Sequence, residues 1–186
     1  MLVLVLGALA FLSPFLVWRW PSGVLLNKWK MPLLIWAALI VQTFALVAKI
    51  PSGLAATLHV ATYVIALVFL WLNRKFPGVL VVGAGAALNG FVIALNGGTL
   101  PASAAAVERA GLERDGGFAN SGVLEDPILL PLGDVFAWPA PMPLANTFSV
   151  GDVLIVVGVW IAVWVGGTTR IGTAGKVDTG NGATGS

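Results

Sequence analysis

The sequence predicts an all-α membrane protein, a five-helix transmembrane bundle with an irregular extracytoplasmic loop. Composition is the first reason: 58% of the 186 residues are hydrophobic, only 10% are charged, and the mean hydropathy is +0.95. A soluble domain carries roughly 25% charged residues, which it needs to cover a surface that faces water. The second reason is that five segments of 18 to 20 residues lack charge or carry it only at their ends. In a helix rising ~1.5 Å per residue, each matches the ~30 Å hydrocarbon core of a bilayer.

The predicted spans are residues 1–18, 31–50, 54–72, 78–96 and 148–166. Within lipid they must be helices, because no water is available to satisfy an open backbone. Pro14 lies inside the first span and predicts that this helix is kinked or ends early. The first span is expected to be retained and not cleaved as a signal peptide, because its positive charge, Arg19, follows the apolar stretch.

Basic residues cluster in the connections on one side of the predicted bundle. Seven of the ten lie in the first loop, the third loop and the tail: Arg19, Lys28, Lys30, Arg74, Lys75, Arg170 and Lys176. Because such residues are retained in the cytosol, we expect a multi-pass protein of the bacterial cytoplasmic (inner) membrane, with its N-terminus outside and its C-terminus inside. Tryptophans at the predicted inner boundary agree with this orientation: Trp18, Trp20, Trp71 and Trp164.

The long connection over residues 97–147 lies outside in this orientation. It holds six acidic and two basic residues, a net charge of −4. Residues 102–112 predict a short amphipathic helix that begins near Ser103 or Pro101. The apolar stretch 127–138 is too short and too broken by proline to span, so we expect it on the outer membrane surface or folded over the helix ends.

Three alternating prolines, Pro139, Pro141 and Pro143, favour a stiff, extended segment that leads to the last span. The whole outer loop is interpreted either as a packed cap or as a dynamic lid over a pocket. Residues 1–166 are expected to form one membrane domain. The Gly-rich tail, 167–186, has almost no apolar residues and is expected to be disordered.

Composition also excludes several classes of function. The absence of cysteine excludes disulfides, thiolate metal sites and cysteine nucleophiles. A single histidine, His59, excludes a multi-histidine metal or haem site. The scattered basic residues form no nucleic-acid footprint. No cofactor or metal is expected, and the expected partners are the lipid bilayer and a membrane or extracytoplasmic protein.

Two asparagines in the fourth span are candidates for a buried polar site. Asn89 and Asn96 lie seven residues apart, on one helical face, and are expected to point into the bundle. Small residues around them, such as Gly83 and Gly90, would let a neighbouring helix approach closely. The asparagines are interpreted either as interhelical hydrogen-bonding residues or as part of a functional site.

The remaining candidates also lie near the outer leaflet. Ser149 and Asp152 have the spacing of a capping box at the start of the last span, which would explain Asp152 structurally. His59 is a candidate proton relay or ligand contact, or a hydrogen-bonded packing residue. If these side chains converge, they form a ligand-binding or structural polar cluster with no catalytic residue among them: Asn89, Asn96, His59, Asp134, Asn146 and Asp152.

Three stretches carry a likeness to a known family. They are Asn73–Gly78, the run LNGFVIALNGGTLP over residues 88–101, and the Leu132–Asp134 triplet together with PLANTFSVGDVLI over 143–155. In these stretches the chain resembles the bacterial membrane-protein family known as domain of unknown function 5317, although Leu100 stands where methionine is expected. The resemblance covers residues 1 to about 166. It implies a small bacterial inner-membrane protein and no particular activity.

Two functions follow as hypotheses. The first is a non-enzymatic accessory, scaffold or sensory module whose polar site lies at its outer leaflet, favoured because no nucleophile–base pair, carboxylate dyad or phosphate loop stands out. The alternative is a small transporter or permease component that uses the same polar cluster as a path. Against transport, the five spans show no obvious repeat.

Overall fold

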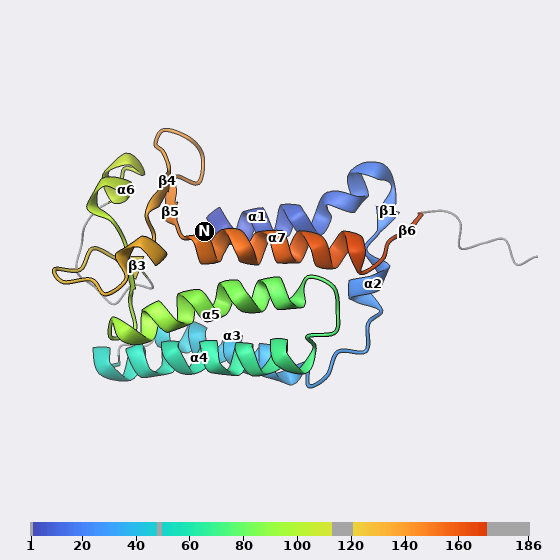
Figure 1. Cartoon of the computed structure of the whole chain (residues 1–186), viewed down its shortest axis with the longest axis horizontal. Coiled ribbons are helices and arrows are strands. Elements are labelled where there is room, and N and C mark those ends of the chain that lie inside the picture. Colours follow the sequence, from blue (N-terminus) through green and yellow to red (C-terminus); the bar gives the residue numbers. More distant parts are fainter. Residues whose placement is uncertain (1, 48–49, 113–120, 171–186) are drawn as a thin grey trace, which may run out of the picture.

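Five long helices lie side by side in a computed structural model that describes residues 2–47, 50–112 and 121–170 (Figure 1). Each packs on the next in the order α1, α7, α5, α4, α3. Their bounds are α1 (Leu2–Leu12), α3 (Leu33–Val47), α4 (Ser52–Leu72), α5 (Val79–Leu95) and α7 (Val150–Val165). The protein is therefore mostly helical, and a helix forms within each of the five predicted segments.

The first helix ends early, as Pro14 predicts. Helix α1 stops at Leu12 and passes into a 3-10 helix, η1 (Ser13–Val17), because proline cannot donate the next helical hydrogen bond. Pro14 itself is buried, and the Ser13 hydroxyl donates to the carbonyl of Ala10 (2.8 Å). The break turns the chain toward the end of α7, where the Trp164 ring nitrogen donates to Ser13 Oγ (2.8 Å).

By length and apolar composition, one helix of the described residues is long enough to cross a membrane. This is α4, with 21 residues. The other four apolar helical stretches are shorter, with 10 to 17 residues each: Leu2–Val17, Leu33–Ala45, Val79–Leu95 and Val150–Val165. Four of the helices are shorter than the spans predicted for them, because proline, glycine or capping residues end several of them early, whereas α4 begins before its predicted span, 54–72.

Helices α5 and α7 approach each other closely because glycines face the contact. A Cβ atom at Gly85 would lie 2.4 Å from the carbonyl oxygen of Gly151, and one at Gly158 would lie 2.6 Å from the backbone nitrogen of Val82. Neither distance is possible for a real side chain, so only glycine permits this backbone separation. Gly90 provides a similar contact on the other side of α5, against the ring of Tyr63 in α4.

At the end of the bundle that carries the loop between α1 and α3, short backbone and side-chain pairings connect the chain segments. Strand β1 (Arg19–Trp20) pairs antiparallel with β6 (Thr169–Arg170), and α2 (Ser22–Leu25) follows β1. Asn73, at the end of α4, accepts from the backbone nitrogen of Lys30 (2.9 Å) and donates to its carbonyl (3.0 Å). The tail is thus paired as far as residue 170, and the predicted disorder of its remainder lies outside the described residues.

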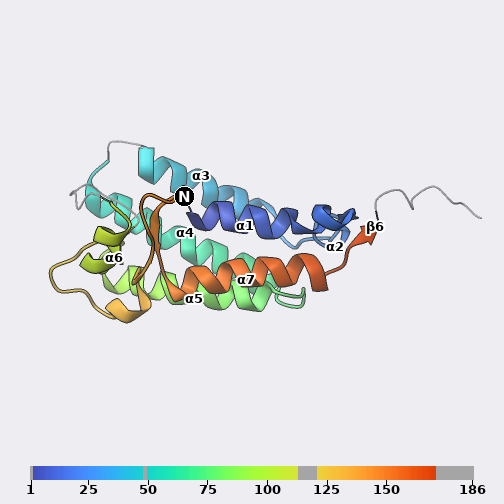
Figure 2. The same ribbon diagram turned by 90° about the horizontal axis from the view of Figure 1, so that it is seen from above.

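The outer loop folds into a small cap at the opposite end (Figures 1 and 2). Short strand pairings connect parts of this loop, while the rest of its described residues, apart from α6 and η2, form turns and irregular structure. Strand β2 pairs parallel with β3, and β4 pairs antiparallel with β5. The cap elements are β2 (Leu100–Pro101), α6 (Ala104–Arg109), β3 (Ser121–Gly122), η2 (Leu130–Leu132), β4 (Phe136–Trp138) and β5 (Asn146–Phe148).

Two expectations for this loop are confirmed and one is corrected. Helix α6 forms inside the predicted helix 102–112, with the Ser103 hydroxyl accepting from the Ala106 nitrogen (3.1 Å) as an N-cap. The apolar stretch 127–138 folds over the end of α5, one of its two expected positions. The prolines at 139–143, however, do not form an extended lead into the last helix. They form the loop of the β4–β5 hairpin, which turns because the Met142 nitrogen donates to the carbonyl of Pro139 (3.0 Å).

The glycine contact between α5 and α7 generates a prediction with a matched control on the same helix. Gly85→Ala is expected to lower the free energy of unfolding in detergent by about 1–3 kcal/mol, because the new methyl group forces the two backbones apart. Gly83→Ala, whose Cβ would lie 3.9 Å from the nearest atom, Leu70 Cβ, is expected to leave stability unchanged or raise it by up to ~1 kcal/mol. Thermal unfolding in micelles measures both, and equal melting temperatures would contradict the packing.

Candidate polar site at the cap end of the bundle

A buried hydrogen-bond network joins the middle of α5 to the start of α7. Asn89 donates from Nδ2 to Asp152 Oδ1 (3.0 Å) and accepts at Oδ1 from the Ser149 hydroxyl (2.9 Å). Asn89 and Ser149 are both fully buried, with 1% and 0% of their surface exposed. Both functional groups of the asparagine amide are thus satisfied by one short segment of the chain.

That segment is the capping box expected from the sequence. The Ser149 hydroxyl accepts from the Asp152 nitrogen (3.0 Å), while the Asp152 carboxylate accepts from the Ser149 nitrogen (2.9 Å). The two residues therefore satisfy the free donors of the first turn of α7 and also bind Asn89. Gly151 allows the approach, because a Cβ there would lie 2.0 Å from Asn89 Oδ1.

Asn96 does not point into the bundle, contrary to the expectation from its spacing to Asn89. It is the C-cap residue of α5, and its amide binds the backbone of Ile128 in both directions. Nδ2 donates to the Ile128 carbonyl (2.9 Å), and Oδ1 accepts from the Ile128 nitrogen (2.8 Å). The helix ends at Leu95, so seven residues of helical spacing no longer hold the two asparagines on one face. Asn96 instead fastens the cap to the end of α5.

His59 has a separate set of contacts. It is 2% exposed, and its Nδ1 lies 2.7 Å from the carbonyl oxygen of Gly98, just past the end of α5. Gly98 adopts a φ of +94° and could not carry a Cβ, which would lie 2.5 Å from Ala56 Cβ. The histidine thus holds α4 against the chain that leaves α5, which agrees with the packing interpretation of this residue.

Asp134 is the residue at which the cap segments meet. Its backbone nitrogen donates to the Pro101 carbonyl (2.9 Å), and its carbonyl accepts from the Ser103 nitrogen (3.1 Å). Its Oδ2 accepts from the hydroxyls of Ser121 (2.5 Å) and Thr147 (3.4 Å). Strands β2, β3 and β5 are therefore tied together through this one residue. Gly133 lets it approach β2, since a Cβ at Gly133 would lie 2.1 Å from the Pro101 carbonyl oxygen.

Among the described residues, no positive charge compensates the Asp134 carboxylate. The residue is 5% exposed, and its Oδ1 is buried with no hydrogen-bond partner in that part of the chain. Burial raises the pKa of Asp134 to about 6; the hydrogen bond from Ser121 lowers it, the nearby charge of Asp152 raises it, and the bond from Thr147 lowers it. Tyr63 of α4 lies within electrostatic reach of both carboxylates. The two acidic residues therefore belong to one electrostatic region at the junction of cap and bundle.

Asn146 belongs neither to the network of Asn89 with α7 nor to the contacts of the Asp134 carboxylate. It lies in β5 opposite Trp138 and neighbours Thr147, whose side chain is buried toward Asp134. Successive side chains of a strand point to opposite faces, so Asn146 faces away from the Asp134 carboxylate.

Sequence reasoning did not single out three residues that complete these contacts: Ser121, Ile128 and Thr147. The alternation of side-chain directions along a strand could have indicated that Thr147 is buried. Ser121 and Ile128 instead pair with distant segments, and no local pattern indicates such pairings.

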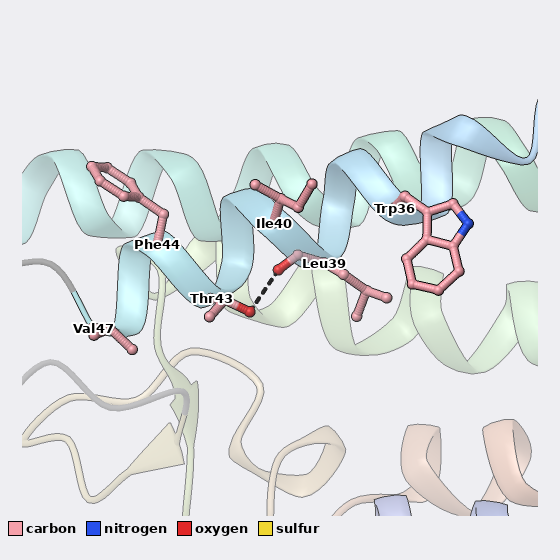
Figure 3. Close-up of a pocket in the computed structure, with 6 residues that line it drawn as sticks. All are labelled: Trp36, Leu39, Ile40, Thr43, Phe44 and Val47. Atoms are coloured by element: carbon pink, nitrogen blue, oxygen red, sulfur yellow. Dashed lines mark hydrogen bonds between the residues drawn. The ribbon is translucent and has the colours of Figure 1, made fainter.

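A groove on the side of the bundle is chemically different from the polar site. It follows one face of α3 and has a volume of about 580 Å³ (Figure 3). The Thr43 hydroxyl is bonded to the Leu39 carbonyl (2.8 Å) of the same helix, and the Trp36 ring nitrogen is the other polar side-chain atom of the lining. A ligand site needs several convergent polar groups, which this groove does not offer. Its lining is Trp36, Leu39, Ile40, Thr43, Phe44 and Val47.

The contacts thus divide the six candidate residues instead of gathering them in one pocket. Asn89 and Asp152 form one network, Asn96 and His59 fasten the two sides of the cap junction, and Asp134 organises the cap. Within the described ranges, no group of three or more His, Asp or Glu side chains could hold a metal ion. The hydrogen bonds in which these residues take part chiefly join elements to one another.

The sequence itself assigns the family. The model of a family of unknown function, DUF5317, matches residues 24–164. This chain belongs to the DUF5317 family. The match includes the three stretches that carried the resemblance, and two of them contain the contacts described above. Asn89 and Asn96 lie in the first of these, and Asp134, Ser149 and Asp152 lie in the second.

One relative of this chain comes from Thermotoga maritima. It is an uncharacterised protein, 35% identical over 97 residues, which make up 51% of this DUF5317 chain and 55% of the relative. The chain thus matches about half the length of that protein. No solved structure matches this chain.

Replacing Asn89 and replacing Asn96 in this DUF5317 chain are expected to destabilise different parts of the protein. Asn89→Leu removes both bonds between α5 and α7 and leaves Ser149 without its buried acceptor, so global stability in detergent is expected to fall by about 1–2 kcal/mol. Asn96→Leu is expected to release the segment around Ile128 while the bundle keeps its melting temperature. Thermal unfolding and amide hydrogen exchange over residues 127–132 separate the two, and the same pattern for both variants would contradict the assignment.

The pH dependence of stability is expected to follow Asp134. Its pKa of about 6 lies above the ordinary value of 3.8, so the folded protein binds this proton more tightly than the unfolded chain. The stabilisation is complete below pH 3.8 and is lost as the pH rises through 6, and it amounts to on the order of 2–3 kcal/mol. The melting temperature should therefore be higher at pH 5 than at pH 7.5. Asp134→Asn should flatten this difference; a difference that persists in the variant would assign it to another group.

Proposed function

We propose that this chain is a non-enzymatic, multi-pass protein of the bacterial cytoplasmic membrane. Helices α1, α3, α4, α5 and α7 cross the bilayer, with the N-terminus outside and the C-terminus inside. The cap faces the exterior and acts as an accessory, scaffold or sensory module that meets a partner protein or a small ligand. The bonds that Asp134 makes within the cap, that Asn96 makes between the cap and α5, and that Asn89 makes between α5 and the start of α7 carry this proposal.

The surface of the helices supports the membrane environment. Large apolar side chains point outward along the bundle, including Leu33, Ile40 and Leu80 with 77%, 69% and 59% of their surface exposed. Soluble monomers rarely expose apolar surface continuously on this scale. In lipid the same surface costs nothing to expose, because the surrounding tails are as apolar as leucine.

The shorter helices are compatible with a span in this arrangement. A helix of 16 residues such as α7 covers ~24 Å, less than the ~30 Å of an average hydrocarbon core. Local thinning of the bilayer accommodates such a difference at modest cost. Helix α4, with 21 residues, is long enough to cross at full thickness.

Charge at the two ends supports the orientation. The turn between α4 and α5 and the β1–α2 segment, which carry Arg74, Lys75, Arg19 and Lys28, lie at the end opposite the cap (Figure 1). The cap end carries most of the acidic residues of the chain. Retention of basic residues in the cytosol then puts the cap outside.

The polar contacts favour a scaffold over a transport path. Asn89 and Asp152 bind each other and Ser149, and His59 binds Gly98, so these groups join helices and are already engaged. A path for ions or substrates needs polar groups that can exchange partners along the route. The cap, by contrast, is held at several independent points, which suits a surface that must keep its shape for a partner.

Cysteine labelling in intact cells tests the topology. The chain has no cysteine of its own, so each variant carries one reactive thiol. Asp126→Cys, exposed in the cap, is expected to react with an impermeant maleimide, and Lys75→Cys, exposed at the other end, is expected to react only after permeabilisation. The reverse pattern would overturn the orientation, and labelling of both in intact cells would overturn the multi-pass arrangement.

The same two variants test the accessory role. A maleimide-linked photo-crosslinker on Asp126→Cys is expected to give a discrete adduct or a ligand-dependent change in reactivity at the cap. The crosslinker on Lys75→Cys, introduced after permeabilisation, provides the matched control at the inner face. Adducts that are the same at both ends, or absent from the cap, would contradict a specific outer partner.

A further inference from the structure

The loop between β4 and β5 is an exposed, uncharged projection of the cap. Every residue from 139 to 144 is exposed, with Met142 at 48% and Leu144 at 45%. No charged residue occurs between Asp134 and Asp152, although the rest of the cap is acidic. An exposed loop in water is normally polar, so an apolar loop of this length points to contact with an apolar medium.

The position of the loop matches the surface of a bilayer that surrounds the five helices. It projects sideways at the level where α1 and α7 begin, close to the N-terminus of α1, and does not extend outward along the helix axes (Figures 1 and 2). The backbone of the loop is therefore placed beside the start of the apolar helices α1 and α7. Helix α6 and the rest of the cap lie farther out along the same axis (Figure 1).

The loop has few backbone donors that would need water. Three of its seven residues are prolines and have no N–H group. The nitrogens of Ala140, Met142 and Ala145 donate to the carbonyls of Arg109 (3.1 Å), Pro139 (3.0 Å) and Met142 (3.2 Å), respectively. The Trp138 ring nitrogen is also engaged, with the carbonyl of Pro143 (3.1 Å). Three of the loop's four N–H groups are thus bonded, and within the described residues only that of Leu144 is not, which lowers the cost of entering a bilayer, where unpaired polar groups are costly.

Leu144 adds a conformational argument. It adopts a φ of +64°, a left-handed conformation that glycine or asparagine would occupy at lower cost. A leucine here places a large apolar side chain, 45% exposed, on the loop at the expense of local strain. Such strain is retained where the side chain serves a purpose that folding alone does not require.

We propose that residues 138–144 form an interfacial anchor that inserts into the outer leaflet beside α1 and fixes the cap against the membrane surface. The occupant of this surface is lipid: Met142 and Leu144 enter the acyl boundary, and Trp138 lies at the headgroup level, where tryptophan is favoured. The inference rests on the topology proposed above, because the loop reaches lipid only if the five helices are embedded.

Spin-label accessibility in phosphatidylcholine nanodiscs tests the anchor. A nitroxide at Met142→Cys reports on the loop. A nitroxide at Ile40→Cys on α3 gives the accessibility expected for a site in lipid, and one at Glu125→Cys in the cap gives the accessibility expected for a site in water. Oxygen partitions into lipid and a nickel chelate remains in water, so Met142→Cys is expected to collide with oxygen as Ile40→Cys does. Its collision rate with the chelate is expected to be roughly five-fold below that of Glu125→Cys.

The outcomes distinguish a failure of the proposed anchor from a failure of the proposed topology. If Ile40→Cys is in lipid but Met142→Cys is as accessible to the chelate as Glu125→Cys, the anchor is wrong and the topology stands. If Met142→Cys is shielded from both reagents, protein covers the loop, and a lipid anchor is again wrong. If Ile40→Cys itself collides with the chelate, the membrane arrangement fails first.

A second variant separates insertion from folding. Leu144→Asn retains the left-handed backbone, which asparagine tolerates, and removes the apolar side chain. The melting temperature is expected to be unchanged, while the chelate accessibility of a label at Met142 rises about two-fold as the loop lifts toward water. Unchanged accessibility in this background would overturn the anchor.

Discussion

The link between Asn89 and the start of α7 is the interaction on which the rest of the structure depends. The cap leaves the bundle at the end of α5 and returns at Ser149, so its two attachment points are held together by the bonds among Asn89, Ser149 and Asp152. Glycines at 85 and 151 bring the helices close enough for these bonds to form. In an apolar surrounding such groups have few other partners, which makes the pairing specific even where its net free energy is modest.

The cap itself is organised around a carboxylate with no counter-charge among the described residues. Asp134 joins three strands through its backbone and side chain, yet one carboxylate oxygen is buried with no partner in the described part of the chain. This arrangement costs stability when the residue is ionised, and it places a titrating group at the centre of the cap. A sensory module would have use for such a group, because a change of charge there reaches β2, β3 and β5 at once.

The proposed membrane arrangement unites features that have no other common cause. Apolar side chains cover the outside of the helices, basic residues lie at one end, and the acidic cap with its uncharged hairpin lies at the other. A cap held by Asn96 at the end of α5 and by lipid beside α1 would be fixed on two sides of the bundle. Its remaining surface, which faces away from the membrane, is then the part that a partner can reach.

The sequence by itself determined the features that depend on neighbours along the chain. The five helical segments, the early end of α1 at Pro14, the Ser103 cap and the capping box of α7 follow from local composition and spacing. Family membership follows from the same residues. Tertiary structure alone decided where Asn96 points, which helix each glycine contacts, and that Asp134 binds Ser121 and Thr147. Those contacts join residues far apart in the chain, and helical periodicity stops predicting direction once the helix ends, as it does at Leu95.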